Sequence, residues 1–288
     1  MSPSSKTLID SSSHLEQVAT GFGFTEGPAW NDKGGYLVFS DIPGNAMWRW
    51  EPESGVAEYR KPSNMGNGST YDPKGRLITC EHATSRVVRE EGDNLVVLAD
   101  HFEGGELNSP NDAVVGPSGD TYFTDPTYGR QEYFGVPREL GQPFRGVYRV
   151  LTTGELQLLA KDFDEPNGLC FSIDGRTLFV NDTERMHIRA FNVGQDGTLS
   201  GGEVWAEVTG EGPGGPDGMK IDVEGNIYCT GPGGFHIFDP DGKHLEAVPT
   251  PEVVGNLAWG ESDRKTLFVC ASTSVYRITT LVPGYRPY

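Results

Sequence analysis

Six side chains that carry a carboxylate or amide oxygen stand at equivalent places along the chain. Each lies eight residues before the last residue of a turn motif; the six are Glu26, Asn67, Asn111, Asn167, Asp217 and Asn256. Asp, Glu and Asn make up roughly a fifth of the chain, so agreement at all six places by chance is on the order of one in ten thousand. Equivalent positions of a repeat meet when the repeats close into a ring. The spacing therefore predicts a ring of six oxygens.

The composition of this ring indicates which ion it would hold. Glu26 and Asp217 are two carboxylates, and no ring position is Lys or Arg. A buried pair of like charges is costly unless a cation balances it. Amide and carboxylate oxygens suit calcium, although other divalent cations are possible, and the lack of His or Cys argues against zinc. The alternative is that these side chains only cap strands and bond nearby backbone.

The elements that must position the ring are short β-strands. A run rich in β-formers follows each turn, at 36–39, 77–80, 121–124, 177–180, 227–230 and 266–269. With two further runs, each of the first five units contains four strands. The units repeat about every 40 to 55 residues, as the blades of a propeller do. The last unit lacks a fourth strand, and 15–19 is a spare one. We therefore predict an all-β, six-bladed β-propeller of four-stranded antiparallel blades, closed by the N-terminal strand.

Composition limits the remaining possibilities. We expect residues 1–13 to form a disordered tail and residues 14–288 to form a single propeller domain. The net charge of −18 disfavours nucleic acid as a partner. The chain has neither an apolar run of the roughly 20 residues that a membrane helix needs nor an apolar signal core, so we expect a cytoplasmic protein without a membrane partner. Its four cysteines lack metal-binding spacing and are expected to be buried free thiols.

Two features outside the ring are candidates for substrate contact. A Gly-, Pro- and aromatic-rich insertion at 126–145 contains Tyr128, which is placed to cover a ligand or to pack on the blade surface. His82 follows the second strand of the second unit and is a candidate base or substrate contact, with a structural histidine as the alternative. Four acidic residues end second strands and are interpreted as bonding local backbone or forming a second polar ring: Asp41, Glu81, Asp125 and Asp182.

Several motifs resemble those of the senescence marker protein/gluconolactonase family of calcium-dependent six-bladed propellers. They are Glu26-Gly27-Pro28, Pro110-Asn111-Asp112, Pro166-Asn167-Gly168-Leu169 and Pro216-Asp217-Gly218-Met219, in the family's order. The resemblance implies that Glu26, Asn167 and Asp217 hold the metal, and that Asn111 contacts metal or substrate. Animal members have Arg where this chain has Ser109, so we expect a changed substrate contact there.

The resemblance also implies a calcium-dependent lactonase acting on a small sugar-type lactone. Asp217 is then the candidate general base, Asn111 and His82 are further catalytic candidates, and Asn111, Ser109, Tyr128 and His82 are candidate substrate contacts. Two alternatives stay open. One is an organophosphate hydrolase of the diisopropyl fluorophosphatase type, and the other is a non-catalytic scaffold stabilised by the metal. The sequence indicates neither the natural lactone nor the oligomeric state.

Overall fold

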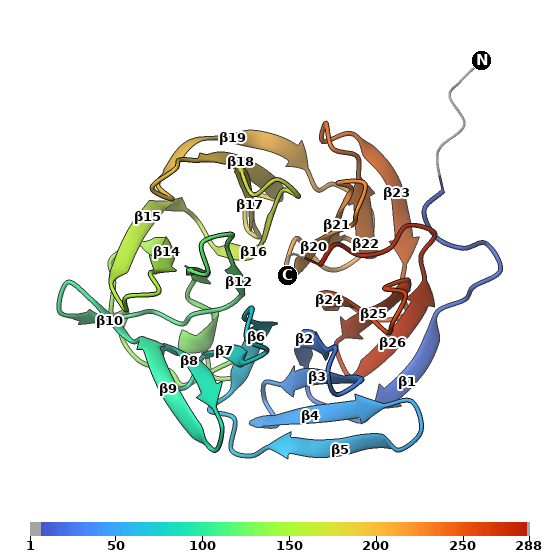
Figure 1. The fold of residues 1–288 in the computed structure, drawn as a ribbon, viewed down its shortest axis with the longest axis horizontal. Coiled ribbons are helices and arrows are strands. Elements are labelled where there is room, and N and C mark those ends of the chain that lie inside the picture. The colour runs from blue at the N-terminus through green and yellow to red at the C-terminus, as the bar shows by residue number, and fades with distance from the viewer. Residues whose placement is uncertain (1–6, 287–288) are drawn as a thin grey trace.

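Six four-stranded antiparallel sheets surround a central axis in the computed structural model, which describes residues 7–286 (Figure 1). The innermost strands are β2 (Thr25–Asn31), β6 (Gly66–Tyr71), β12 (Ala113–Val115), β16 (Pro166–Phe171), β20 (Met219–Ile221) and β24 (Val254–Gly260). The second strands are β3 (Tyr36–Asp41), β7 (Leu77–Glu81), β13 (Thr121–Asp125), β17 (Thr177–Asp182), β21 (Ile227–Gly231) and β25 (Thr266–Ala271). The predicted six-bladed propeller is confirmed.

The outer half of each blade completes this pattern. The third strands are β4 (Ala46–Glu51), β8 (Arg86–Glu91), β14 (Arg145–Val150), β18 (His187–Val193), β22 (Gly234–Phe238) and β26 (Ser274–Thr279). The outermost strands are β5 (Gly55–Arg60), β9 (Asn94–Ala99), β15 (Leu156–Phe163), β19 (Leu199–Glu207), β23 (His244–Pro249) and β1 (Glu16–Thr20). A small hairpin, β10 (His101–Phe102) and β11 (Gly105–Glu106), and one 3-10 turn, η1 (Tyr128–Arg130), lie in connections.

The hydrophobic core lies between neighbouring blades. Second strands are buried on both faces, so they consist largely of apolar and aromatic residues. Between the first and last blades, for example, the rings of Trp30 and Phe268 stack with centroids 5.5 Å apart. Such packing fixes the height of each innermost strand relative to the next one, and therefore aligns their first residues around the axis.

Strand β1 closes the ring, as the spare N-terminal strand predicts. It pairs antiparallel with β26, with Glu16 opposite Arg277 and Thr20 opposite Ser274. The carboxylate of Glu16 also accepts a hydrogen bond from Arg277 Nε at 2.8 Å. In Figure 1 the blue β1 accordingly lies beside the red β26. This pairing covers a sheet edge that would otherwise offer unpaired backbone groups.

The predicted disordered tail needs a correction for its last part. Residues 1–6 lie outside the described residues, but Leu8 and Ile9 are buried in the same apolar cluster as the last blade. The Leu281 amide donates to the Leu8 carbonyl at 2.8 Å, and Ile9 forms a β-bridge with Thr280. Two apolar residues in a polar segment were too few to produce a periodic signal. In the structure they pack against the apolar cluster of the last blade.

Replacing Leu8 with alanine is expected to destabilise the protein by about 2–4 kcal/mol, because the substitution leaves a cavity in a fully buried cluster. Urea unfolding of the two proteins measures the difference. The matched control is Leu95→Ala, since Leu95 is 40% exposed on an outer strand, and it should cost less than about 0.5 kcal/mol. Equal effects of the two substitutions would contradict the packed position of Leu8.

Two further expectations concern the whole chain. All four cysteines are free and buried within the described residues, as predicted. None of the helical segments in residues 7–286 is both long and apolar enough to span a membrane.

Candidate functional site

The six predicted ring residues lie at the start of the innermost strands. Glu26, Asn67, Asn167 and Asn256 are within the first three residues of β2, β6, β16 and β24, whereas Asn111 and Asp217 come two residues before β12 and β20. Asn256 Nδ2 donates to Glu26 Oε2 at 2.9 Å and to Asp112 Oδ2 at 3.3 Å. One amide therefore joins the last, first and third blades, which places these side chains at the axis.

Close approach of the blades explains why glycine follows four of the ring residues. A Cβ atom on Gly27 would lie 1.9 Å from the carbonyl oxygen of Asn67, and one on Gly168 would lie 2.0 Å from that of Asp217. Gly27 also has a φ of 52°, a value that other residues rarely adopt. No side chain fits at these places without moving the next blade. The glycines therefore let the ring residues converge.

Side chains from the second strand of one blade hold the backbone of the next ring residue. Ser40 Oγ donates to the Asn67 carbonyl at 2.9 Å, and Thr124 Oγ1 to that of Asn167 at 2.8 Å. Asn181 Nδ2 donates to the Asp217 carbonyl at 2.6 Å. Each ring residue held in this way is thus oriented by its neighbour as well as by its own strand.

Acidic residues at the ends of second strands anchor the loops that lead into the ring. Asp125 accepts hydrogen bonds from the amides of Asn108 and Ser109 at 2.8 and 2.7 Å. Asp41 accepts from Gly23, and Asp182 from Asp164, at 3.0 and 2.8 Å. These carboxylates bond backbone across 16 to 18 residues. Asp41 and Asp182 also accept from the amides of Gly44 and Arg185 in their local turns, at 3.3 and 3.4 Å, as one of the two interpretations holds.

Two charged groups of the ring, Asp112 and Lys220, were not predicted from the sequence. Asp112 is buried beside Asn256, in the place after the ring residue where four other blades have glycine. Lys220 Nζ donates to Asn256 Oδ1 at 3.1 Å and lies 3.9 Å from Asp112 Oδ2. The departure from glycine at position 112 is a signal that could have been found. When all are ionised, the three carboxylates and one ammonium group carry two net negative charges. The two carboxylates predicted from the sequence would carry the same net charge by themselves.

These charges raise the pKa values of the ring carboxyls. Burial raises the pKa of Glu26, and the nearby Asp112 adds to this effect. Burial likewise raises the pKa of Asp217 well above its usual range, with further contributions from Glu26 and Asp112. The pKa of Asp112 is also raised by burial, although Lys220 opposes the shift. The ring is thus electrostatically strained unless a cation or protons neutralise it.

Several oxygens of the ring have the environment that a bound cation requires. Glu26 Oε1, Asn67 Oδ1 and Asn167 Oδ1 are buried and have no hydrogen-bond partner among the described residues. Because buried oxygens are almost always paired, three unpaired ones at one axis call for a ligand. No group of three His, Cys, Asp or Glu side chains within residues 7–286 has metal-binding geometry by itself. A cation site here must therefore use amide oxygens, which fits a hard divalent ion.

His82 has the hydrogen bonds expected of the structural alternative, while its role as a base or substrate contact stays a prediction. It is buried, and its Nδ1 lies 2.8 Å from the Phe134 carbonyl, which can only accept, so Nδ1 carries the proton. Its Nε2 then accepts a hydrogen bond from Asn67 Nδ2 at 3.0 Å. Burial lowers the pKa of His82 to about 4, so the imidazole of His82 is neutral at pH 7. With both nitrogens occupied, His82 positions Asn67 and leaves the amide oxygen of Asn67 unpaired.

The neutral state of His82 predicts how stability depends on pH. An unfolded chain binds a proton on this histidine near pH 6.5, whereas the folded protein does so near pH 4. Stability should therefore fall as pH decreases through this window, by about 3 kcal/mol from this one group. His82→Gln can replace both hydrogen bonds but cannot titrate.

Urea unfolding at several values between pH 4 and 6.5 checks this prediction. The loss of stability should be smaller in His82→Gln than in the wild type. His101→Gln is the control, since His101 is exposed, and should follow the wild type. Parallel curves for all three proteins would contradict a buried, neutral His82.

The long insertion lies between β13 and β14, as predicted, and reaches the ring. Burial raises the pKa of Tyr128, and the charge of Asp217 adds to the shift. Asn111 is buried, and its carbonyl accepts from Gly68 at 2.8 Å. Ser109 is also buried and supports the insertion: its hydroxyl donates to the Pro126 carbonyl at 2.7 Å and accepts from Gly129 at 3.0 Å. This hydroxyl is therefore bonded within the protein, and contact of Ser109 with a substrate stays a prediction.

Fold and site together define a class of protein: a six-bladed propeller with a buried, acidic ring of oxygens at one end of its axis. The family model described as "SMP-30/Gluconolactonase/LRE-like region" matches residues 24–273. The chain belongs to this family, as its motifs indicate.

Relatives with assigned names support this placement. A gluconolactonase of Zymomonas mobilis is 32% identical, with 98% of this chain and 86% of the relative covered. A pentonolactonase of Haloferax volcanii is 27% identical, with 88% and 82% covered. Among solved structures, the gluconolactonase XC5397 of Xanthomonas campestris has a TM-score of 0.88 at 30% identity, covering 95% of this chain and 91% of that chain.

Proposed function

We propose that this protein hydrolyses sugar-type lactones and that its axial ring holds a calcium ion. The observation that carries the proposal is the set of three unpaired, buried oxygens on Glu26, Asn67 and Asn167 beside the carboxylate of Asp217. The relatives named as gluconolactonase and pentonolactonase support the substrate class. Glu26, Asn167 and Asp217 are the proposed metal ligands, with Asn111 contacting metal or substrate. Other divalent cations remain candidates for the same oxygens.

A calcium ion at this place would polarise the lactone carbonyl and stabilise the negative charge that develops on its oxygen. The protein's contribution is to hold the ligands rigidly: each lies on or beside an innermost strand, and neighbouring blades bond the backbone of Asn167 and Asp217. Rigid placement reduces the reorganisation needed during reaction.

Asp217 is the proposed general base. Its amide donates to Thr230 Oγ1 at 2.7 Å and its carbonyl accepts from Asn181 at 2.6 Å, so the residue is held at both ends. It accepts a proton from the attacking water while the water oxygen bonds to the carbonyl carbon. When the bond between this carbon and the ring oxygen breaks, Asp217 returns the proton to the leaving oxygen. The products balance as one hydroxy acid from one lactone and one water.

The insertion at 126–145 is the proposed substrate cover. Tyr128 is the substrate-contacting candidate, because the insertion carries it and the charge of Asp217 contributes to raising its pKa. The rings of Phe134 and Phe24 pack edge to face at 5.1 Å, and Tyr133 Oη donates to the Gly23 carbonyl at 3.1 Å. These contacts tie the insertion to the first blade. The insertion would thereby exclude water from the reacting carbonyl.

The direct test is to measure hydrolysis of D-glucono-δ-lactone with calcium and with a chelator, after subtracting the spontaneous rate. Diisopropyl fluorophosphate is assayed in parallel. We expect calcium-dependent turnover of the lactone and a much lower rate with the fluorophosphate. A panel of γ- and δ-lactones then identifies the preferred ring. No lactone turnover in excess calcium would reject the proposal, and preferential fluorophosphate turnover would favour the phosphorus-ester alternative.

A further inference from the structure

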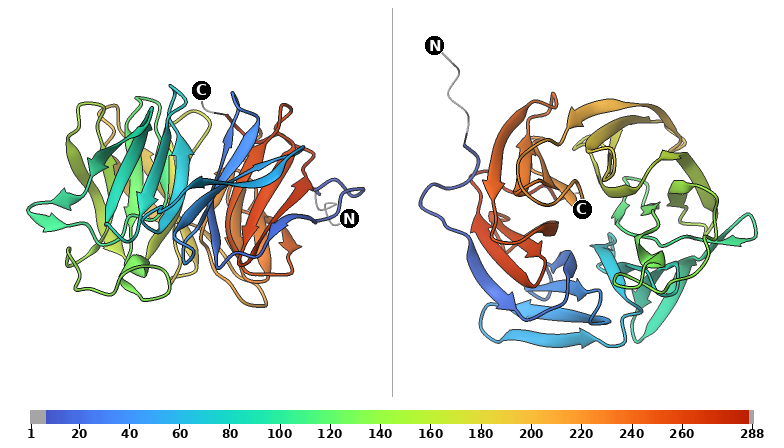
Figure 2. Two further views of the ribbon diagram at one scale, coloured as in Figure 1. Left: turned by 90° about the horizontal axis from the view of Figure 1, so that it is seen from below. Right: turned by 180° about the vertical axis from the view of Figure 1, so that it is seen from behind.

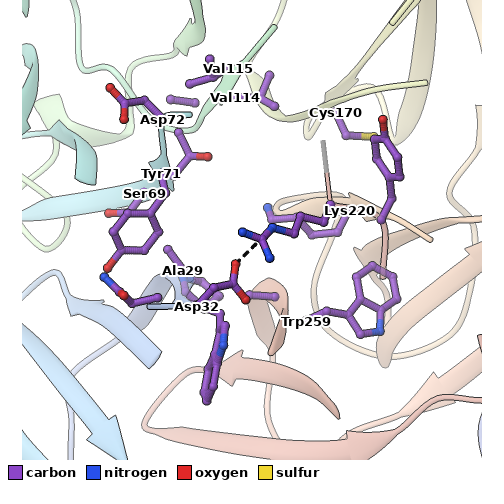
Figure 3. Close-up of a pocket in the computed structure, with 18 of the residues that line it drawn as sticks. Ala29, Asp32, Ser69, Tyr71, Asp72, Val114, Val115, Cys170, Lys220 and Trp259 are labelled. Carbon is purple, nitrogen blue, oxygen red and sulfur yellow. Dashed lines mark ion pairs between the residues drawn. The ribbon is translucent and has the colours of Figure 1, made fainter. Parts of the chain in front are cut away.

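A second tier of side chains lines the axis beyond the oxygen ring. It consists of the residues three positions after each ring residue: Ala29, Thr70, Val114, Cys170, Lys220 and Trp259. All six line one cavity of about 490 Å³ (Figure 3). This volume is in the range of small-molecule sites in proteins. The same repeat that forms the ring thus forms a separate chamber along the axis.

This chamber opens at the opposite end from the candidate lactone site. Its rim contains Asp32, Lys33 and Lys74, which lie in the turns that follow β2 and β6, and Arg286 near the chain end. The insertion at 126–145 follows β13 and therefore lies at the end where the ring residues are. Figure 2 (left) shows that green insertion on the face of the disc opposite the end of the chain. Lys220 and Asn256 stand between the two sites.

The lining of the chamber is positive in a protein of net charge −18. It contains five cationic residues and two acidic ones; the cationic ones are Lys33, Lys74, Lys220, Arg264 and Arg286. Both carboxylates are already bonded to guanidinium groups, Asp32 to Arg264 at 2.7 Å and Asp72 to Arg76 at 2.7 Å. A concentration of positive charge in a concave site attracts anions.

The ammonium groups of three lysines are able to bind an anionic ligand. Lys33 and Lys74 are exposed and form no ion pair with a carboxylate of residues 7–286. Lys220 has three N–H donors at the inner end of the chamber. Two of them find protein acceptors, the Met219 carbonyl and Asn256 Oδ1, both at 3.1 Å, while Asp112 Oδ2 is beyond hydrogen-bond distance at 3.9 Å.

The walls between these charges are apolar and aromatic. Val114, Val115, Leu169 and Phe171 line one side, and Trp259 another. Figure 3 shows Val114 and Val115 across the chamber from Trp259, with Lys220 between them. Apolar walls favour a ligand with an apolar body, and the cations favour a negative group attached to it.

We propose that this chamber is a second ligand site, which binds a small organic anion with an apolar, planar body. The anionic group is a carboxylate or sulfonate held by the lysines, and the body packs against Trp259 and the facing valines. The site is distinct from the oxygen ring, whose acidic groups repel anions unless a cation is bound.

Isothermal titration calorimetry of the calcium-loaded protein with naphthalene-2-sulfonate tests the proposal. Naphthalene-2-sulfonamide, the same ring system without charge, is the matched ligand control. We expect one sulfonate per chain, bound at least about tenfold more tightly than the sulfonamide.

Two variants locate the binding. Val114→Trp places a bulky ring on the wall where the planar body is proposed to pack and should weaken binding roughly tenfold or more. Lys33→Glu/Lys74→Glu reverses charge on exposed turns and should weaken binding roughly tenfold or more without affecting the core. Lys243→Glu changes the same charge at an exposed turn outside the chamber, and should bind like the wild type. Thermal unfolding of each variant establishes that it is folded.

Several results would overturn the proposal. These are no binding of the sulfonate up to its solubility limit, equal affinity for the sulfonate and sulfonamide, or unchanged binding by the chamber variants. Binding that is unchanged in Val114→Trp but is lost in Asp217→Asn would assign the anion to the oxygen ring and equally reject the chamber. Since calorimetry measures no turnover, this result is independent of the lactonase assay.

Discussion

Asp217→Asn is expected to lower kcat/KM for lactone hydrolysis by roughly 100- to 10,000-fold. The substitution removes the proposed proton acceptor and one metal ligand but keeps the size of the side chain. The backbone bonds of residue 217 to Thr230 and Asn181 do not involve the side chain and remain possible. The fold should therefore persist. Initial rates with D-glucono-δ-lactone at saturating calcium measure the effect.

A matched control separates this loss from a general effect of Asp→Asn substitution. Asp241 is exposed in a turn of the same blade, and Asp241→Asn should have wild-type activity. Thermal unfolding should show that Asp217→Asn is folded, since it removes a carboxylate whose pKa is raised by burial and by Glu26 and Asp112. Near-wild-type turnover by a folded Asp217→Asn protein would eliminate Asp217 as the base. If lactone turnover is absent from the wild type as well, the scaffold alternative is favoured.

Calcium is expected to raise the melting temperature of the metal-free protein by roughly 5 °C or more. Binding at one hundred times the dissociation constant stabilises the folded state by about 2.7 kcal/mol, and in a chain of this size each kcal/mol corresponds to about 2–4 °C. The physical source is the ring itself, where three unpaired oxygens and two net negative charges gain a partner. Differential scanning calorimetry after chelation, followed by addition of calcium or magnesium, measures the shift.

Glu26→Gln is expected to stabilise the metal-free protein against unfolding. In the wild type the folded Glu26 has a raised pKa, so the folded state binds more protons than the unfolded chain above the ordinary glutamate pKa. Metal-free stability consequently falls as pH rises through that window. The neutral glutamine removes this cost, and we expect the metal-free variant to be about 1–3 kcal/mol more stable than the wild type at pH 8.

Glu26→Gln should also lose most of the stabilisation by calcium, because the substitution removes a proposed metal ligand and its negative charge. Glu58→Gln is a suitable control, as Glu58 is exposed on an outer strand, and should retain the shift. A calcium-induced rise of equal size in Glu26→Gln and the wild type would place the ion elsewhere. No rise in the wild type would reject the metal site.

Much of the fold was predictable because a propeller is a repeat. Each unit keeps the same offset between its turn and its innermost strand, so one alignment of turns locates six equivalent residues. The closure by β1 followed from counting strands, since a last blade with three strands leaves one edge open. Leu8 and Ile9 were missed because they belong to no repeat and are recognised only by the core against which they pack.

The chemistry within the site was predictable only in part. Glu26, Asn167 and Asp217 are marked by motif and by ring position, and the glycines after them reflect the close approach of adjacent blades. The hydrogen-bond partners of His82 and Ser109 were not predictable from the sequence. Their side chains bond to Phe134 and Pro126, which the insertion brings to them from 52 and 17 residues away along the chain. A loop of irregular length has no periodicity from which such contacts can be inferred.

The sequence by itself was sufficient for the blade count, the closing strand and the six oxygens, because all three depend on periodic spacing along one chain. The charge balance of the ring depended on contacts between blades. Asn256 reaches Glu26 across 230 residues and Asp112 across 144, and Lys220 comes to the same amide from the fifth blade. Asp112 and Lys220 lie outside the ring positions; comparison of the repeats marks Asp112 as a departure from glycine but does not indicate which side chains it meets. Their meeting at the axis follows from the packing of six sheets, which determines which side chains share the buried space.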